Sequence, residues 1–311
     1  MVRITVPSLA KLNLDLRVLH KRPDGYHELR TIFQTISLRD TLTIEFDFAK
    51  QTQIDLCSSV NIQDNLVVRS AKLVLNHLEL KAWVRFALSK RIPMGAGLGG
   101  GSSNAAAVLI ALPALAGKRI PAVELVRLAE SLGSDVPFFL HGGTALGCGR
   151  GSEIYPLPDQ PSRPALVVST AVHVSTPDAY QALARDVTDP LTSQAESPIL
   201  REFQTIAWAI NGSSLDQFPL KNDFEPAVFD KHPEILTALR ALRRLGAKPA
   251  RMTGSGSALF GVFQTVEETS AAAAKWPAGT AFPVRFVSRR HYVRLWRRAL
   301  STVVDRSCFA R

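Results

Sequence analysis

The chain has 311 residues, of which 46% are hydrophobic and 21% are charged. This balance is typical of globular proteins, and it excludes fibrous, collagen-like and intrinsically disordered chains. The formal net charge of +10, from 37 basic and 27 acidic residues, suits a polyanionic partner or a phosphorylated substrate. At this length we expect one large domain or two of ordinary size, each with its own core.

The cysteines and the hydropathy of the chain indicate its cellular compartment. Cys57, Cys148 and Cys308 lie far apart and form no C-x-x-C pair, so neither a disulfide scaffold nor a structural zinc site is expected. No apolar run has the length that a membrane span requires. The N-terminal residues alternate between apolar and polar side chains, unlike a signal peptide. We therefore expect a cytoplasmic protein with no membrane partner.

The N-terminal residues have the period-two alternation of β-strands. Such alternation predicts strands over residues 2–8, 12–19, 29–38 and 40–48. The sequence Pro-Asp-Gly at residues 23–25 is a turn signal between the second and third of these strands.

A helical period follows over residues 64–78, with Asp64 as the expected N-cap. Residues 83–92 then predict another strand, which leads into a glycine-rich stretch.

Two helices are expected after that stretch. The alanine-rich residues 104–112 favour a helix that stops near Pro113. Residues 121–133 favour a second helix, with Gly133 as its C-terminal stop.

The turn-rich residues 156–164 predict the passage to a second half. We therefore expect an N-terminal domain over residues 1–157 and a C-terminal domain over 158–311, the latter ending in a basic extension. Strands and helices do not alternate regularly, which favours an α+β fold over a doubly wound parallel sheet. The expected elements of the second half are strands at 165–170 and 257–263 and helices at 197–210 and 232–246.

The glycine-rich stretch PMGAGLGGGSSNAAA occupies residues 93–107. Gly95, Gly97 and Gly100 match the spacing G-x-G-x-x-G of dinucleotide sites. Such a site needs a strand that runs directly into the first glycine and an acidic residue at a later strand end. Here a polar segment with a proline intervenes, and Glu124 falls within a helical pattern. The match to a dinucleotide site is therefore poor.

Two other nucleotide loops are also excluded. A Walker loop needs Gly-Lys before Ser or Thr, and no lysine occurs in residues 93–107. A protein-kinase glycine loop joins two strands, whereas this one precedes a helix. The stretch instead offers a row of backbone N–H groups, the hydroxyls of Ser102 and Ser103, and a helix N-terminus. These features suit a nucleoside triphosphate.

The pattern P-x-G-x-G-L-G-x-x-S-S-x-A-A resembles the phosphate-binding motif of the GHMP kinase family. Two further motifs of that family occur in order, AKLNLDLRV from Ala10 and RMTGSGSALFGVF from Arg251. The resemblance implies a two-domain α+β GHMP kinase fold with the active site in the cleft between the domains. It also implies an ATP-dependent kinase of a small molecule.

Three longer stretches resemble one branch of that family, whose acceptor is 4-diphosphocytidyl-2-C-methyl-D-erythritol (CDP-methylerythritol) of the non-mevalonate isoprenoid pathway. That branch phosphorylates the 2-hydroxyl of the acceptor. The three stretches are AKLNLDLRVLHKRPDGYHELRTIFQTISLRD from Ala10, GSDVPFFLHGGTALGCGRG from Gly133 and LKNDFEPAVF from Leu220.

The resemblance implies two catalytic residues. Asp135 matches the family's catalytic aspartate and would be the general base. Lys11 matches the active-site lysine, which would pair with Asp135 and hold it ionised. Outside this context, the aspartate would be a turn or cap residue and the lysine an exposed strand residue. Strand periodicity places Lys11, Asn13 and Asp15 on one face, which we expect to point into the cleft.

The acceptor's cytidine end has its own candidate residues. Tyr26 and His27 match the family's G-Y-H element, which would stack on the pyrimidine and hydrogen-bond to its edge. Tyr180 corresponds to a second aromatic over the cytosine, and Thr176 lies beside it. The two tyrosines would clamp the ring from both sides. The alternative for Tyr180 is a partly buried hinge residue.

ATP is expected along the glycine loop, with its adenine near residues 64–66 and the strand before the loop. Magnesium is expected because it neutralises the β- and γ-phosphate oxygens. Its protein ligand is not evident, and Ser102 and Ser103 are the candidates. The expected ATP contacts are Asn65, Leu66, Ser89, Lys90, Pro93, Met94, Gly95, Ala96, Gly97, Leu98, Gly99, Gly100, Gly101, Ser102 and Ser103.

Two alternative functions remain. Within the same fold, the acceptor would be another small alcohol such as homoserine or mevalonate, although these have no base for Tyr26 and Tyr180 to stack on. The second alternative is a protein without catalytic activity that binds a nucleotide or a nucleic acid through its net charge of +10. No zinc-finger or RNP-type motif accompanies that charge, so we expect no nucleic-acid partner. A monomer or a homodimer is expected.

Overall fold

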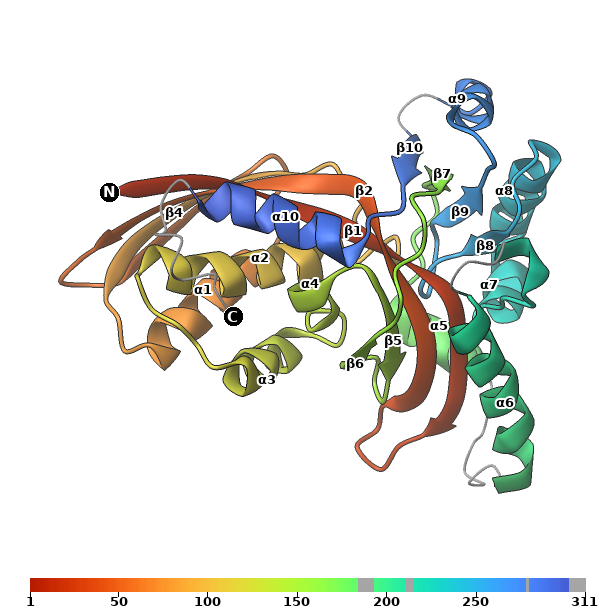
Figure 1. The fold of residues 1–311 in the computed structure, drawn as a ribbon, viewed down its shortest axis with the longest axis horizontal. Coiled ribbons are helices and arrows are strands. Elements are labelled where there is room, and N and C mark those ends of the chain that lie inside the picture. The colour runs from red at the N-terminus through yellow and green to blue at the C-terminus, as the bar shows by residue number, and fades with distance from the viewer. Residues whose placement is uncertain (184–192, 211–214, 278–279, 302–311) are drawn as a thin grey trace.

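The computed structural model describes residues 1–183, 193–210, 215–277 and 280–301. Its strands form two sheets, and helices pack on each of them, as Figure 1 shows. The long β1–β2 hairpin belongs to the first sheet and extends toward α5 and α6 of the second half. The structure therefore has the mixed α+β architecture that the sequence predicts.

The first sheet has the order β3-β4-β2-β5-β6, with β1 paired to β2. All of its pairs are antiparallel except β3 with β4. Its strands are β1 (Val2–Lys21), β2 (His27–Phe48), β3 (Gln53–Ser58), β4 (Ala82–Ser89), β5 (Thr144–Cys148) and β6 (Glu153–Pro156).

The β1–β2 hairpin confirms the turn predicted at residues 23–25. The four strands expected over residues 2–48 are in fact two long ones, because bulges bend the pairing without ending it. One register shift lies between Asn13 and Asp15. A one-residue shift reverses which side chains face a given side. The prediction that Asp15 shares a face with Lys11 and Asn13 is therefore wrong.

Beyond the bulge, the cleft-facing side chain is Leu16. Asp15 is fully buried and forms an ion pair with Arg17 of the same strand at 2.8 Å.

The second sheet has the order β10-β7-β9-β8, and its pairs are antiparallel. The strands predicted at 165–170 and 257–263 are confirmed as β7 and β9, with shorter bounds. The strands of this sheet are β7 (Pro164–Val168), β8 (Ala250–Met252), β9 (Leu259–Val262) and β10 (Ala281–Arg285).

The helices are divided between the two sheets. Those near the first sheet are α1 (Leu66–His77), α2 (Gly100–Leu115), α3 (Ala122–Leu132), α4 (Phe138–His141) and α10 (Arg289–Leu300). Those of the second half are α5 (Thr176–Ala182), α6 (Ser193–Ala209), α7 (Glu225–Lys231), α8 (Pro233–Arg244), α9 (Val266–Ala274) and the 3₁₀ turn η1 (Leu215–Gln217).

The C-terminal helix α10 returns to the first sheet. Tyr292, Trp296 and Leu300 of this helix are buried in the same cluster as Ile4 and Val6 of β1. Figure 1 shows α10 lying along β1, away from the second sheet. The division at residue 157 stays a prediction, but the last described helix packs on the first half.

Two predicted helix limits differ in the structure. The N-cap of α1 is Asn65, whose side chain accepts from the Val67 N–H at 3.0 Å, and not Asp64, which has a positive φ of 48°. Helix α2 starts at Gly100 and continues through Pro113 to Leu115. Because α2 is buried on almost all sides, packing stabilises the turn around the proline. The predicted stop of α3 at Gly133 is confirmed.

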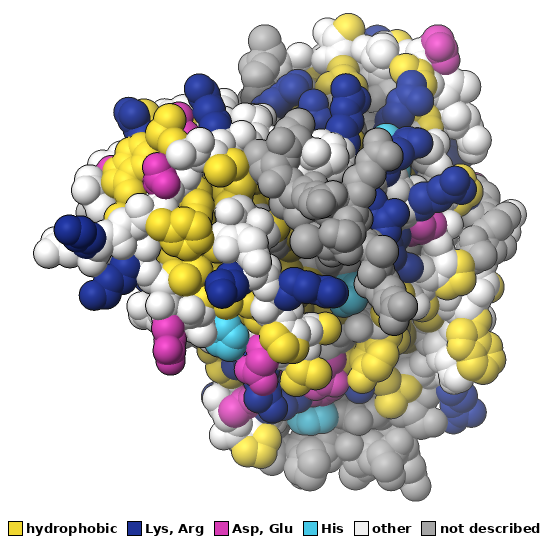
Figure 2. Space-filling view, turned by 60° about the vertical axis from the view of Figure 1, so that its left-hand side comes forward, with side chains coloured by type: hydrophobic (Ala, Val, Ile, Leu, Met, Phe, Trp, Pro, Cys, Tyr) yellow, Lys and Arg dark blue, Asp and Glu magenta, His cyan; other side chains and the backbone are white. Residues whose placement is uncertain are grey.

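The basic side chains on one face of the molecule do not form a single patch. Figure 2 shows lysine and arginine side chains at several separate places on one face, with acidic and apolar side chains between them. Among the described residues, no helix is both long enough and apolar enough to cross a membrane.

Candidate active site

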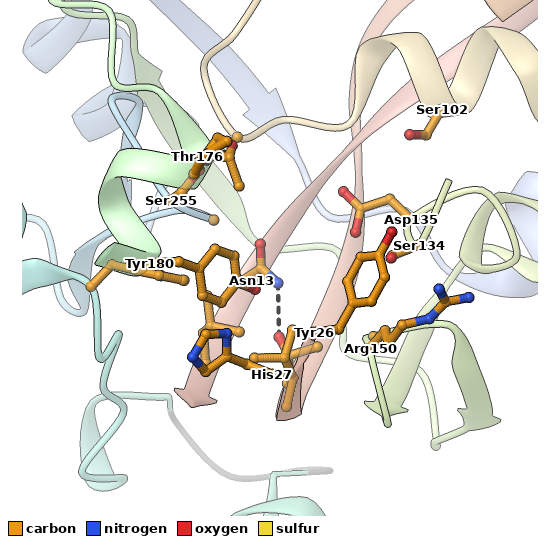
Figure 3. Close-up of a pocket in the computed structure, with 18 of the residues that line it drawn as sticks. Asn13, Tyr26, His27, Ser102, Ser134, Asp135, Arg150, Thr176, Tyr180 and Ser255 are labelled. Carbon is orange, nitrogen blue, oxygen red and sulfur yellow. Dashed lines mark hydrogen bonds between the residues drawn. The ribbon is translucent and has the colours of Figure 1, made fainter. Parts of the chain in front are cut away.

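A cavity of about 820 Å³ lies where the β1–β2 hairpin, the glycine loop, α5 and the C-terminal glycine loop (residues 253–258) meet. Both halves of the chain contribute to its lining, as Figure 3 shows. The predicted site residues that line it are Lys11, Asn13, Tyr26, His27, Gly97, Ser102, Asp135, Thr176 and Tyr180.

Lys11 and Asp135 form an ion pair inside this cavity. The ammonium Nζ of Lys11 lies 3.3 Å from Oδ2 of Asp135. The lysine side chain is only 4% exposed, whereas that of the aspartate is 33% exposed. The carboxylate is therefore open to a substrate, and the lysine behind it is held by the protein. Strand β1 brings the lysine, and the segment between α3 and α4 brings the aspartate.

Asn13 holds the lysine in place. Its Oδ1 accepts from Nζ of Lys11 at 2.7 Å, and its Nδ2 donates to the hydroxyl of Thr31 on β2 at 2.8 Å. The backbone N–H of Asn13 donates to the hydroxyl of Thr253 at 3.0 Å. These bonds fix β1 against both its neighbouring strand and the second half of the chain.

The glycine loop passes close to the backbone of Thr253 and to the side chains of Phe139 and Lys11. A Cβ on Gly97 would lie 2.3 Å from the carbonyl oxygen of Thr253, so only glycine fits there. A Cβ on Gly99 would lie within 3.1 Å of both Phe139 and Cγ of Lys11. The loop is tied to β1 by the Lys11 N–H, which donates to the Leu98 carbonyl at 3.0 Å. The glycines thus allow the loop to sit against the lysine.

The loop also presents free backbone donors. Within the described part of the chain, the backbone N–H groups of residues 97–102 donate to no backbone carbonyl. Gly99, in the left-handed conformation, is the N-cap of α2 and offers no side chain to its first turn. A helix start with unpaired N–H groups is a ready anion site. Of the two candidate serines, Ser102 lines the cavity, whereas the hydroxyl of Ser103 is buried.

Asp40, which the sequence analysis did not single out, holds both ends of the glycine loop. This fully buried carboxylate of β2 accepts from the backbone N–H groups of Arg91 and Ile92 at 2.7 and 2.8 Å, just before the loop. It also accepts from Nδ2 of Asn104, near the start of α2, at 3.1 Å. Its ion-pair partner is Lys90. The ammonium of Lys90 is therefore engaged within the protein.

The residues expected around adenine adjoin the loop from α1 and β4. Leu66 Cδ1 lies 3.5 Å from the position of a Cβ on Gly101, and Lys90 Nζ lies 3.1 Å from one on Gly100. Nδ2 of Asn65 is buried without a partner. Neither Ser89 nor these three residues lines the cavity. Pro93, Met94 and Gly95 do not line it either, and the side chains of Ala96 and Leu98 are buried in the core.

Aromatic side chains line the opposite end. The rings of His27 and Tyr180 stack with centroids 4.8 Å apart and an interplanar angle of 19°. Phe224 packs edge-on against Tyr180 at 4.9 Å. Tyr26 lies on the other side of the cavity, as Figure 3 shows. The face of Tyr180 is thus occupied by His27, an arrangement that the sequence did not predict, and the two-tyrosine clamp stays a prediction.

Burial and nearby charges shift the pKa values of Tyr180 and His27. Burial raises the pKa of Tyr180 to about 12, with a smaller contribution from the negative charge of Asp135, so its hydroxyl stays protonated. Burial lowers the pKa of His27, and the positive charge of Lys21 adds to the effect. The imidazole is therefore neutral at neutral pH and has both a donor and an acceptor nitrogen.

The structure adds basic residues at this aromatic end. Arg150 places its guanidinium 4.6 Å from the ring centroid of Tyr26, and it lines the cavity together with Lys21. Arg150 follows β5 in the GCGRG turn, within a stretch that the sequence analysis compared with a family motif. The sequence signal that could have pointed to Arg150 is a positively charged residue within a glycine-rich turn. Cationic groups here suit an acceptor that carries phosphate.

Two sequence families match the chain. The GHMP kinases N terminal domain matches residues 65–143, which contain the glycine loop and Asp135, and the GHMP kinases C terminal family matches residues 199–279. The 4-diphosphocytidyl-2-C-methyl-D-erythritol kinase of Solibacter usitatus is 50% identical over 94% of this chain and 92% of its own length.

The chain belongs to the GHMP kinase family. Its relatives also include the 4-diphosphocytidyl-2-C-methyl-D-erythritol kinase of Burkholderia multivorans, which is 38% identical over 87% of this chain and 89% of its own.

Solved structures agree with this assignment. A crystal structure of 4-(cytidine 5'-diphospho)-2C-methyl-D-erythritol kinase matches this GHMP kinase with a TM-score of 0.75 and 35% identity, over 91% of this chain and 99% of the other. A homoserine kinase from Cytophaga hutchinsonii matches with a TM-score of 0.70 at 18% identity, over 92% and 95% of the two chains. The second likeness shows the shared fold.

Proposed function

We propose that this GHMP kinase transfers the γ-phosphoryl group of ATP to the 2-hydroxyl of 4-diphosphocytidyl-2-C-methyl-D-erythritol, a step of non-mevalonate isoprenoid biosynthesis. One observation carries the proposal. A single cavity is lined by a glycine loop, the Lys11–Asp135 ion pair and a set of aromatic side chains. The names of the relatives support this acceptor.

Asp135 is the general base of the proposed reaction. Its carboxylate takes the proton of the 2-hydroxyl while the oxygen forms a bond to the γ-phosphorus and the bond to the leaving ADP breaks. Lys11 forms an ion pair with the same carboxylate and keeps it aimed at the acceptor. The ammonium also balances negative charge that develops on the transferring group. The transfer is direct, without a phospho-enzyme.

The donor phosphates occupy the free N–H groups of the glycine loop and the start of α2. Among the described residues, no group of three or more histidine, cysteine or acidic side chains could hold a metal ion. Mg²⁺ usually keeps several waters and is held by substrate phosphates with one or two protein groups, and the hydroxyl of Ser102, which lines the cavity, can supply one such group. When bound, it would neutralise phosphate charge, and Ser102 is its proposed protein contact.

The acceptor's cytosine is read at the aromatic end. Tyr26 and Tyr180 supply faces for stacking, and the neutral His27 supplies hydrogen bonds to the base edge. For this to occur, the base enters beside Tyr180, where His27 now stacks. Thr176 lies at the start of α5 near the same end. Lys21 and Arg150 are placed to attract the diphosphate of the acceptor.

We further infer that residues 1–157 and 158–311 are the two functional units, with the reaction in the cleft between them. We place the enzyme in the cytoplasm, as a monomer or a homodimer.

The proposal is tested by comparing acceptors. The value of kcat/KM is measured for CDP-methylerythritol and for methylerythritol phosphate, which lacks the cytidine. Base stacking contributes about 1–3 kcal/mol, which corresponds to a roughly 5- to 150-fold preference for the cytidine-bearing acceptor. Mevalonate and homoserine serve as controls and are expected to give no product. Equal turnover of the acceptor without cytidine would contradict the substrate assignment.

A further inference from the structure

The segment at residues 220–225, from the family-like stretch LKNDFEPAVF, lies beside the catalytic strand. The Leu16 N–H donates to the Lys221 carbonyl at 2.8 Å, and the Asp223 N–H donates to the Leu16 carbonyl at 3.0 Å. The Lys221 N–H also donates to Oδ1 of Asp15 at 2.6 Å. This segment of the second half is therefore bonded directly to β1, a few residues from Lys11 and Asn13.

Asn222, in the middle of that segment, uses its side chain to bond to two other pieces of chain. Its amide is 4% exposed, and its Nδ2 donates to the carbonyls of Met252 and Gly254 at 2.9 and 2.8 Å. Its Oδ1 accepts from the backbone N–H of Phe224 at 3.0 Å. Both N–H groups and one lone pair of the amide are thus engaged with backbone.

The two carbonyls that Asn222 holds lie on either side of Thr253. The carbonyl of Thr253 limits the position of Gly97 in the glycine loop, which we call the donor loop, because a Cβ on Gly97 would lie 2.3 Å from this carbonyl oxygen. The hydroxyl of Thr253 accepts from the Asn13 N–H, and Asn13 in turn holds Lys11. The position of this one residue therefore affects both the donor loop and the catalytic ion pair.

The third bond of Asn222 leads to the acceptor end. The backbone N–H of Phe224 donates to Oδ1 of Asn222. The side chain of Phe224 lines the cavity and packs edge-on against Tyr180. A single buried amide is thus bonded to the elements that place the donor loop, the ion pair and an aromatic ring of the acceptor site.

We propose that Asn222 is a positioning residue that sets the distance between the γ-phosphate and the acceptor hydroxyl. The inference rests on the proposed function. Only an amide of this length donates twice to the loop and accepts from Phe224. Alanine leaves the carbonyls of Met252 and Gly254 without their donor. Aspartate keeps the shape and the bond to Phe224 but points a carboxylate oxygen at the two carbonyls.

The test measures kcat, both KM values and coupling in Asn222→Ala and Asn222→Asp. Coupling is the fraction of consumed ATP that appears as phosphorylated acceptor and not as free phosphate. A displacement of about 1 Å lowers the rate of an oriented reaction about 100-fold. We expect kcat to fall by about 10- to 100-fold in both variants, both KM values to change by less than about threefold, and coupling to fall because water competes with a misplaced hydroxyl.

Gln160→Ala is the matched control. The buried amide of Gln160 donates to the Ile210 carbonyl at 2.7 Å, and the residue does not line the cavity. Its loss should lower the thermal midpoint without changing coupling. If both Asn222 variants keep wild-type coupling and a kcat within threefold of wild type, or behave as Gln160→Ala does, the positioning role is wrong.

The isosteric Asn222→Asp variant keeps the test decisive if the alanine variant does not fold. Activity of the wild type is measured first, and it separates the two claims. If the wild type phosphorylates a different alcohol, the proposed acceptor is wrong, and coupling in the variants is measured with that alcohol.

Discussion

Gly97→Ala is the most informative single change in the glycine loop. The glycine has a φ of +75°, and an added Cβ would lie 2.3 Å from the Thr253 carbonyl oxygen and 3.1 Å from its carbon. A normal C···O contact is about 3.3 Å, so the two glycine loops would have to separate by about 1 Å. The backbone of residue 97 fixes the position of the Cβ, and its partner is a backbone carbonyl, so no side-chain rotation relieves the contact.

Two magnitudes follow. The left-handed conformation costs alanine about 1–2 kcal/mol, and the overlap adds about 1–3 kcal/mol of strain. A displacement of about 1 Å between donor and acceptor lowers kcat about 100-fold. The assay is steady-state phosphorylation of CDP-methylerythritol, together with urea unfolding of the same preparation. We expect folded protein with kcat reduced by about two orders of magnitude.

Gly117→Ala is the control for backbone strain alone. Gly117 has a φ of +64°, lies in the exposed turn after α2, and has no atom within 4 Å of an added Cβ. This variant should lose the same conformational stability and keep its kcat. If Gly97→Ala keeps a kcat similar to that of Gly117→Ala, the close approach of the two loops does not matter for catalysis and the reasoning is refuted.

Three other predictions concern the base, a buried ion pair and an imidazole. Asp135→Asn should lower kcat by roughly 10²-fold or more with little change in the KM for ATP; a kcat within tenfold of wild type would exclude the general-base role. Asp40→Asn leaves the buried ammonium of Lys90 unpaired, so the free energy of unfolding in urea should fall by about 3–5 kcal/mol, and a loss below about 1 kcal/mol would contradict this. Because burial and the positive charge of Lys21 lower the pKa of His27, the midpoint of its protonation lies below the usual value of 6.5. As the pH falls, the KM for the acceptor should therefore rise with a midpoint below pH 6.5, because the protonated imidazole loses its acceptor nitrogen; a midpoint above 6.5 would refute the lowered pKa.

Much of the site could be predicted because its chemistry lies in short, characteristic stretches. Lys11 and Asp135 are 124 positions apart in the sequence, yet the family resemblance paired them, and the structure places their charged atoms 3.3 Å apart. The free N–H groups of the glycine loop follow from its composition, because several glycines before a helix leave few side chains to cap it. Their roles in catalysis stay predictions until the variants are measured.

Other features could not be predicted because they depend on register and on distant backbone. Strand period places Asp15 with Lys11, but the bulge between Asn13 and Asp15 reverses the face, and nothing in the local sequence marks it. Pro113 predicts a helix end, but the burial of α2 outweighs the local preference.

Asp40 and Asn222 were missed for a related reason. Each acts through bonds to backbone atoms at the ends of loops far away in sequence. A polar residue in a strand or a loop has many possible partners, and only the folded chain selects one.

The most direct test of the account is the identity of the product. ATP and CDP-methylerythritol are incubated with the enzyme, and the products are examined by ³¹P NMR and mass spectrometry. The account predicts one ADP for each new phosphate monoester, and places that monoester on the 2-oxygen of the methylerythritol unit with the diphosphate intact. Free phosphate with an unchanged acceptor, or a monoester on another oxygen, would contradict it.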